Sequence, residues 1–79
     1  MMDKRLCDMA VGQTATIKRL TSPPGIRRRL LDIGCTEGTP VTCLFTGPSG
    51  EPRAYQIRGA VMALRREDAK TIIVKRNET

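Results

Sequence analysis

The segment PVTCLFTGPSGEPRAYQIR, residues 40–58, carries the strongest structural signal in the chain. Residues 40–46 alternate between two sets of side chains, the period of a half-buried strand, and a run dense in turn-forming residues follows at 47–52. A second alternating stretch comes directly after that run, so we predict a β-hairpin. Its predicted buried face carries Val41, Cys43, Phe45, Tyr55 and Ile57.

Shorter strands are predicted on either side of this hairpin. TATIKRL, residues 14–20, alternates in the same way until Leu20 breaks the parity, so we expect this strand to end or bulge there. Two further aliphatic strands are expected at 61–64 and 71–74. Before the first of these strands, a short turn is expected to pin the amino end of the chain onto the core; its residues are Leu6, Met9 and Gly12.

One helix is predicted after the TSPPG run at 21–25. Ser22 followed by Pro23 is typical of a helix N-cap and first turn, and Gly34 supplies the positive φ that closes a helix. A single helical turn is expected at 65–69, just before the last strand. The apolar stripe of the main helix consists of Ile26, Leu30 and Ile33.

About five short strands, one short helix and a single 3₁₀ turn indicate a mainly β protein. Closing such strands into a small barrel buries one aliphatic face and protects the sheet edges, so an SH3-like barrel is expected. The 79 residues fit one domain, 1–79, with its core at about 6–74. The core must be largely aliphatic, because the chain has no Trp, one Phe and one Tyr.

Composition excludes several kinds of chemistry. Histidine is absent, which excludes imidazole-based triads, HExxH zinc sites and Cys2His2 fingers. The formal charge of +6 favours an acidic partner. The longest aliphatic run, at 72–74, is far below the ~20 residues that cross a bilayer. The N-terminus also carries charges where a signal peptide has its apolar stretch, so we expect a soluble protein.

The three cysteines form no CxxC pair, so the spacing predicts neither a disulfide framework nor a thiolate zinc site. A reducing cytosol fits this pattern best. Cys35 and Cys43 are expected to act as small buried hydrophobes rather than as iron ligands, whereas Cys7 is expected to be exposed.

Three spaced blocks resemble the FeoA family, small cytosolic accessory proteins of bacterial ferrous iron transport. They are RRRLLDIGCTEGTPV at 27–41, PSGEP at 48–52 and ALRREDAKTIIV at 63–74. The chain departs from the family pattern where cysteines replace aliphatic residues, Glu replaces the Asp of the hairpin loop, and Arg replaces an apolar residue at the start of the next strand. These departures are Cys35, Cys43, Glu51 and Arg53.

The resemblance implies an SH3-like barrel that assists FeoB, a membrane transporter with a cytosolic GTP-binding domain, and docks on its cytosolic part. The family is associated with transition-metal binding, but no catalytic, cofactor-binding or metal-ligating residue is carried over, and no cofactor is expected. The expected location is cytoplasmic, near the membrane but not inserted in it. Self-association is left open.

Arginines are the candidate partner-binding residues, since isolated surface charges add little to stability and are free to serve recognition. The alternative is an ordinary solvated helix face. The candidates are Arg27, Arg28, Arg29, Arg53, Arg58, Arg65 and Arg66. The glycines match no phosphate-binding motif, so direct GTP binding is not expected, and those assigned to structural turns are Gly34, Gly38, Gly47, Gly50 and Gly59.

Other functions agree less well with the sequence. A small nucleic-acid-binding barrel is favoured by the charge but disfavoured by the lack of surface aromatics, so no specific nucleic acid is expected. A stand-alone relative of the C-terminal barrel of iron-dependent repressors is a third hypothesis, although 79 residues leave no space for the helix-turn-helix of a repressor. Binding of proline-rich peptides needs more aromatics than two, and no residues suggest an enzyme.

Overall fold

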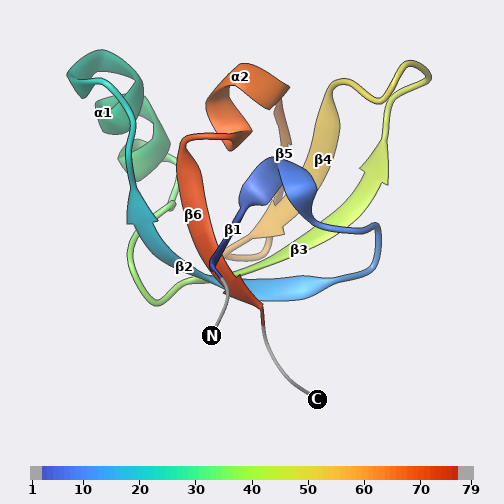
Figure 1. Cartoon of the computed structure of the whole chain (residues 1–79), viewed down its shortest axis with the longest axis horizontal. Helices are drawn as coiled ribbons and strands as arrows, with labels where there is room; N and C mark the ends of the chain where they lie inside the picture. The colour runs from blue at the N-terminus through green and yellow to red at the C-terminus, as the bar shows by residue number, and fades with distance from the viewer. Residues whose placement is uncertain (1–2, 77–79) are drawn as a thin grey trace.

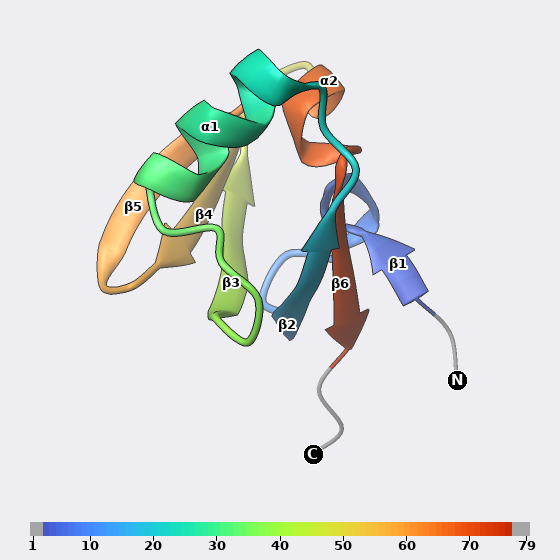
Figure 2. The same ribbon diagram turned by 90° about the vertical axis from the view of Figure 1, so that its left-hand side faces the viewer.

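The computed structural model describes residues 3–76, which form one strongly curved antiparallel sheet with helices at one end (Figures 1 and 2). The strands lie in the order β1-β6-β2-β3-β4-β5. The mainly β, barrel-like fold is therefore confirmed. Along the chain the elements are β1 (Asp3–Arg5), η1 (Leu6–Asp8), β2 (Thr14–Leu20), α1 (Pro24–Asp32), β3 (Pro40–Thr46), β4 (Arg53–Ile57), β5 (Ala60–Leu64), α2 (Arg66–Ala69) and β6 (Ile72–Arg76).

The strand count is six rather than about five, because β1 also joins the sheet. Asp3 and Arg5 lie opposite Lys75 and Ile73 of β6. Three consecutive charged residues carry no alternating signal, so this strand depends on its partner rather than on its own sequence. The 3₁₀ turn also lies elsewhere than expected, since it is η1, whereas α2 is a single α-helical turn.

A bulge in β3 corrects the prediction for Phe45. Cys43 lies opposite Tyr55 and Phe45 opposite Ala54, so Leu44 is an extra residue with no direct partner. An extra residue reverses the alternation of side chains beyond it. The side chain of Phe45 is consequently 59% exposed instead of buried.

β2 carries a similar irregularity, as the break in its pattern suggested. The register with β6 shifts between Ile17 and Arg19, which places the bulge at Lys18, two residues before the predicted position. The strand ends at Leu20, as expected.

The core is aliphatic apart from Tyr55, which is fully buried. Cys35 and Cys43 are also fully buried, which confirms their structural prediction. Cys7 was predicted to be exposed, but it is only 5% exposed. It lies in the η1 turn, which folds the amino end inward together with Leu6 and so removes the thiol from solvent.

The start of α1 differs by one residue from the prediction. The helix begins at Pro24 with Pro23 in the N-cap position, and no side chain caps it. The hydroxyl of Ser22 instead shares a 2.7 Å hydrogen bond with the hydroxyl of Thr71, which joins the helix start to the segment before β6. At the other end of the helix Gly34 has φ +105°, as predicted.

Candidate partner-binding surface

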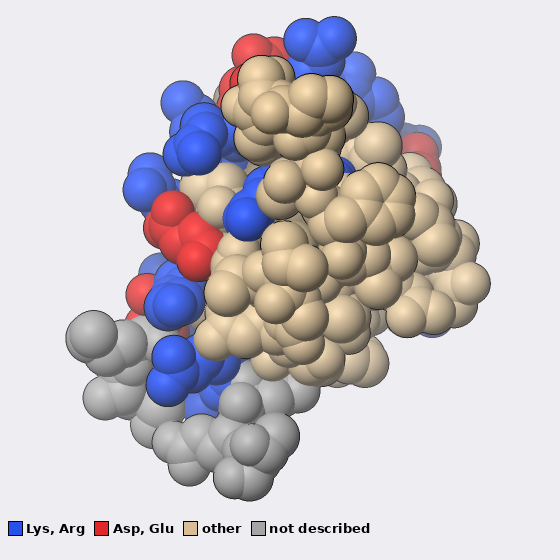
Figure 3. Space-filling model, turned by 90° about the vertical axis from the view of Figure 1, so that its right-hand side faces the viewer, with Lys and Arg blue, Asp and Glu red and all other residues tan. Residues whose placement is uncertain are grey.

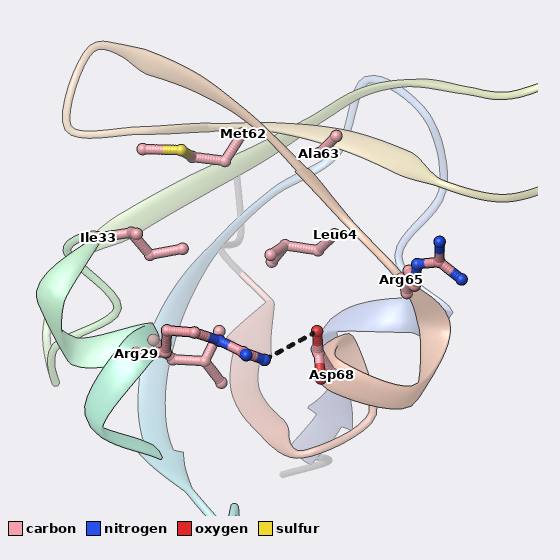
Figure 4. Close-up of a pocket in the computed structure, with 8 residues that line it drawn as sticks. Arg29, Ile33, Met62, Ala63, Leu64, Arg65 and Asp68 are labelled. Carbon is pink, nitrogen blue, oxygen red and sulfur yellow. Dashed lines mark ion pairs between the residues drawn. The ribbon is translucent and has the colours of Figure 1, made fainter. Parts of the chain in front are cut away.

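A groove of about 330 Å³ lies where α1, β5 and α2 meet (Figure 4). Its apolar floor comes from two elements, since Leu30 and Ile33 belong to α1 and its C-terminal end, and Met62 and Leu64 belong to β5. Leu30 and Leu64 are buried, whereas the other two are partly exposed. The apolar stripe of the helix therefore packs on the barrel but leaves part of its surface open to a ligand.

Charged residues border this floor. Arg29 of α1 pairs with Asp68 of α2 at 3.8 Å, and Figure 4 shows this pair across one side of the groove. The Arg29 side chain is 69% exposed and that of Asp68 17% exposed, so solvent weakens the pair and leaves the arginine accessible. Arg65 borders the groove beyond Leu64, and its guanidinium points away from the floor.

Three of the seven predicted arginines bind within the fold. Arg27 donates to the Leu20 carbonyl at 3.1 Å. Arg53 is only partly exposed, and Arg58 holds the loop after α1. Each of these three arginines therefore has a structural role.

Arg53 makes the strongest of these contacts. Its Nη1 donates to the carbonyls of Cys7 and Met9, each at 2.7 Å. The Tyr55 hydroxyl donates to the Leu6 carbonyl at 3.3 Å, so two side chains of β4 together hold the carbonyls of the η1 turn. The position that departs from the family pattern thus binds the amino end of the chain to the barrel.

Arg58 lies in the tight turn between β4 and β5. It has φ +53° and Gly59 has φ +79°, the two positive values of a type I′ hairpin turn. The Arg58 Nη2 donates to the Thr36 hydroxyl at 3.2 Å. A Cβ at Gly34 would lie 2.9 Å from the Arg58 Cδ, so that glycine makes room for the arginine.

The remaining four arginines are exposed; Arg29 and Arg65 line the groove, and Arg28 and Arg66 are their neighbours in the chain. We call them the arginine rim: Arg28, Arg29, Arg65 and Arg66. Arg28 lies 4.0 Å from Asp32 in a highly exposed pair. Within residues 3–76, the side chains of Arg65 and Arg66 form no ion pair. The rim is therefore a concentration of largely uncommitted positive charge beside an apolar floor.

Glu51 has a structural function that sequence reasoning missed. Its Oε1 accepts a 2.7 Å hydrogen bond from the backbone N–H of Arg66, the first residue of α2. A carboxylate at a helix N-terminus satisfies a free donor. The acidic residue of the PSGEP block could have indicated a capping role, but its partner lies 15 residues away in the sequence.

The thiols have little chemical reactivity at neutral pH. Burial raises the pKa of Cys35 to about 11, and burial also raises the pKa of Cys7 and Cys43. All three therefore remain protonated, and a neutral thiol is a poor nucleophile and metal ligand. In the part of the chain that the structure describes, no three His, Cys, Asp or Glu side chains gather into a metal site.

Another face of the molecule differs from the groove in carrying few charged side chains. Figure 3 shows a broad face that is largely uncharged, with Lys and Arg gathered along its border. The charge of this protein is thus unevenly spread over its surface, which favours a partner that recognises one side of the molecule.

The comparisons with known proteins agree with the fold. A family model described as the FeoA domain matches residues 4–76. The solution structure of the FeoA protein from Chlorobium tepidum is 28% identical with a TM-score of 0.87, covering 94% of this chain and 70% of that chain. The FeoA of Stenotrophomonas maltophilia, described as an SH3-domain protein and crystallised with zinc, is 28% identical with a TM-score of 0.81, covering 95% of this chain and 91% of that chain.

A curated relative is the Fe(2+) transport protein A/Fe(2+) transporter FeoB fusion protein of Porphyromonas gingivalis, 34% identical over 71 residues. The match covers 90% of this chain but only 8% of the relative. The chain thus corresponds to a small part of that protein. Among residues 3–76, neither helix has the length and apolar character needed to span a bilayer.

Proposed function

Because this chain belongs to the FeoA family of ferrous iron transport, we propose that it is a non-enzymatic accessory protein that binds the cytosolic part of a FeoB-type transporter. The fusion relative supports this proposal, since it carries a FeoA part and a FeoB part in one chain. Fusion keeps two partners at high effective concentration, an arrangement that is useful when the separate parts must meet. The expected location is cytoplasmic, beside the membrane.

The observation that carries the proposal is the arginine rim beside the apolar groove. Apolar surface next to accessible arginine is typical of the central residues of protein interfaces. The rim arginines are accessible for this purpose, because the arginine side chain of each of their ion pairs is largely exposed and such pairs contribute little to stability. We therefore place the transporter contact on the α1 and α2 end of the molecule.

A nucleic-acid partner is less well supported. Stacking of bases needs exposed aromatic side chains, and Tyr55 is fully buried. Phe45 alone is exposed, and one aromatic residue does not make a stacking platform.

The test is a calorimetric titration of the purified chain against the cytosolic part of the transporter and, separately, against mixed-sequence duplex DNA. Each titration is done at about 50 and about 200 mM salt. Binding through a shaped interface persists at the higher salt, whereas binding to DNA by charge alone falls by a factor on the order of 10³ or more. Binding to DNA alone would contradict the proposal.

Charge reversal then locates the interface. We expect Arg28→Glu with Arg29→Glu to weaken transporter binding at least about tenfold, because arginine is enriched among interface hot spots, whose loss costs about 2 kcal/mol or more. The matched control is Lys75→Glu with Arg76→Glu, the same change in charge at the far end of β6 (Figure 2). Equal weakening by both pairs would show that only the net charge matters.

A further inference from the structure

The sheet has two edges, and they differ in how they are protected. β1 is short and consists only of charged residues, which discourages pairing with another chain. β5 has the sequence AVMAL with no charge at all, and within residues 3–76 it pairs only with β4. Val61 is 60% exposed on this strand. An uncharged, exposed edge is an unusual feature unless another strand binds there.

The hairpin turn determines which backbone groups are free. Ile57 and Ala60 flank the two-residue type I′ turn as a pair. In such a hairpin the flanking pair exchanges both hydrogen bonds, and alternate residues along the strand then point their N–H and C=O groups outward. The outward groups of β5 therefore belong to Val61 and Ala63.

Side chains on the two faces of β5 differ as well. Met62 and Leu64 point toward α1 and form the groove floor with Ile33 (Figure 4). Val61 and Ala63 are exposed, and strand alternation directs their side chains to the opposite face, while other atoms of Ala63 still contribute to the groove lining. A strand added beside β5 would have its alternate side chains against the floor and the others in solvent.

The charge beside the groove favours an acidic occupant. Arg29 and Arg65 border the groove, and within residues 3–76 Asp68 is the only acidic residue lining it. A second copy of this chain would bring its own arginine rim against the first, so like charges disfavour self-pairing at this edge.

We propose that β5 receives an extended segment of alternating aliphatic and acidic residues as a seventh strand. Its aliphatic side chains pack on Ile33, Met62 and Leu64, and its carboxylates lie on the opposite face, where the Arg65 guanidinium, which points away from the floor, can meet them. That the segment belongs to the transporter rests on the proposed function; the strand-addition site itself stands on the geometry of β5 and its groove.

The probe is a capped nine-residue peptide of alternating Val and Glu, titrated into the isotope-labelled full chain and followed by amide chemical shifts. A peptide with Lys in place of Glu is the control. We expect shifts at residues 61–65 and at the end of α1 with the acidic peptide, and much weaker shifts with the basic one. No shifts at millimolar peptide, shifts elsewhere, or equal binding of both peptides would overturn the proposal.

Three variants test the direction and mode of binding. Met62→Lys puts a charge on the groove floor and should weaken peptide binding at least about tenfold. Val61→Lys adds the same charge on the opposite face and should leave peptide binding unweakened. Ala63→Pro removes an outward N–H and should also abolish binding, because proline is tolerated at a strand edge but cannot donate. Equal effects of the two lysine variants would overturn the assignment of faces, even if the proline variant fails to fold.

The cytosolic part of the transporter is added last, to the sample holding bound acidic peptide. Displacement of the peptide supports both the site and its partner. Peptide binding without any transporter binding would refute the proposed function and leave the strand-addition site standing.

Discussion

Replacing Arg53 with Met should destabilise the protein strongly without affecting partner binding. Methionine keeps much of the apolar stem but removes the guanidinium that donates to the Cys7 and Met9 carbonyls, each at 2.7 Å. A hydrogen bond to a charged group contributes about 1.5–3 kcal/mol. Because the site is partly exposed, water replaces some of this energy, and we expect a loss of about 2–4 kcal/mol.

Urea unfolding followed by circular dichroism measures this loss. A domain of this size has a total stability of roughly 4–12 kcal/mol, and each kcal/mol lost lowers its melting temperature by about 4–8 °C. The control Arg28→Met should change stability by at most about 0.5 kcal/mol, because that arginine makes only an exposed 4.0 Å pair. A loss below about 1 kcal/mol for Arg53→Met, or equal losses for both variants, would show that Arg53 does not hold the amino-terminal turn.

Three other predictions concern the interior and its close contacts. Burial raises the pKa of Cys35 from 9.0 to about 11, so the unfolded state loses its proton first and stability should fall by up to about 2.7 kcal/mol as pH rises from below 9 to above 11. Urea titrations of Cys35→Ala should show a flatter pH dependence, and an unchanged slope would contradict this cause. Gly34→Ala should cost about 1–2 kcal/mol in urea unfolding, because φ is +105° and the new Cβ would meet Arg58; a neutral result would mean that the turn relaxes freely. Cys7 should react with Ellman's reagent only as fast as the protein unfolds, because its thiol is buried, and rapid native labelling would place it at the surface.

Features with a local cause could be predicted from the sequence. The hairpin of β3 and β4 followed from alternation on both sides of a turn-rich run, and the end of α1 followed from Gly34. The burial of Cys43 followed from its place between Val41 and the rest of the strand. Each of these depends on residues within a few positions of one another.

Features set by distant partners could not be predicted. Phe45 is exposed because the register with β4 shifts after Cys43, and a bulge of this kind leaves no composition signal. The extra strand β1 depends on pairing with β6 at the other end of the chain. The prediction of Ser22 as N-cap was wrong because its hydroxyl instead bonds to that of Thr71, 49 residues away.

The arginines show why charge alone could not locate the site. Arg53 and Arg29 have the same side chain and are equivalent candidates in the sequence. In the structure Arg53 donates hydrogen bonds to carbonyls 44 and 46 residues away, whereas Arg29 forms one ion pair and stays accessible. A group already bound inside the fold would lose its partners on meeting a ligand, so a partner gains most from groups that the fold leaves unpaired. The same reasoning applies to the backbone, where β5 keeps a free edge while β1 is short and charged. Accessible arginines and a strand edge that is unpaired within residues 3–76 lie beside the same groove, and this coincidence makes it the site to test.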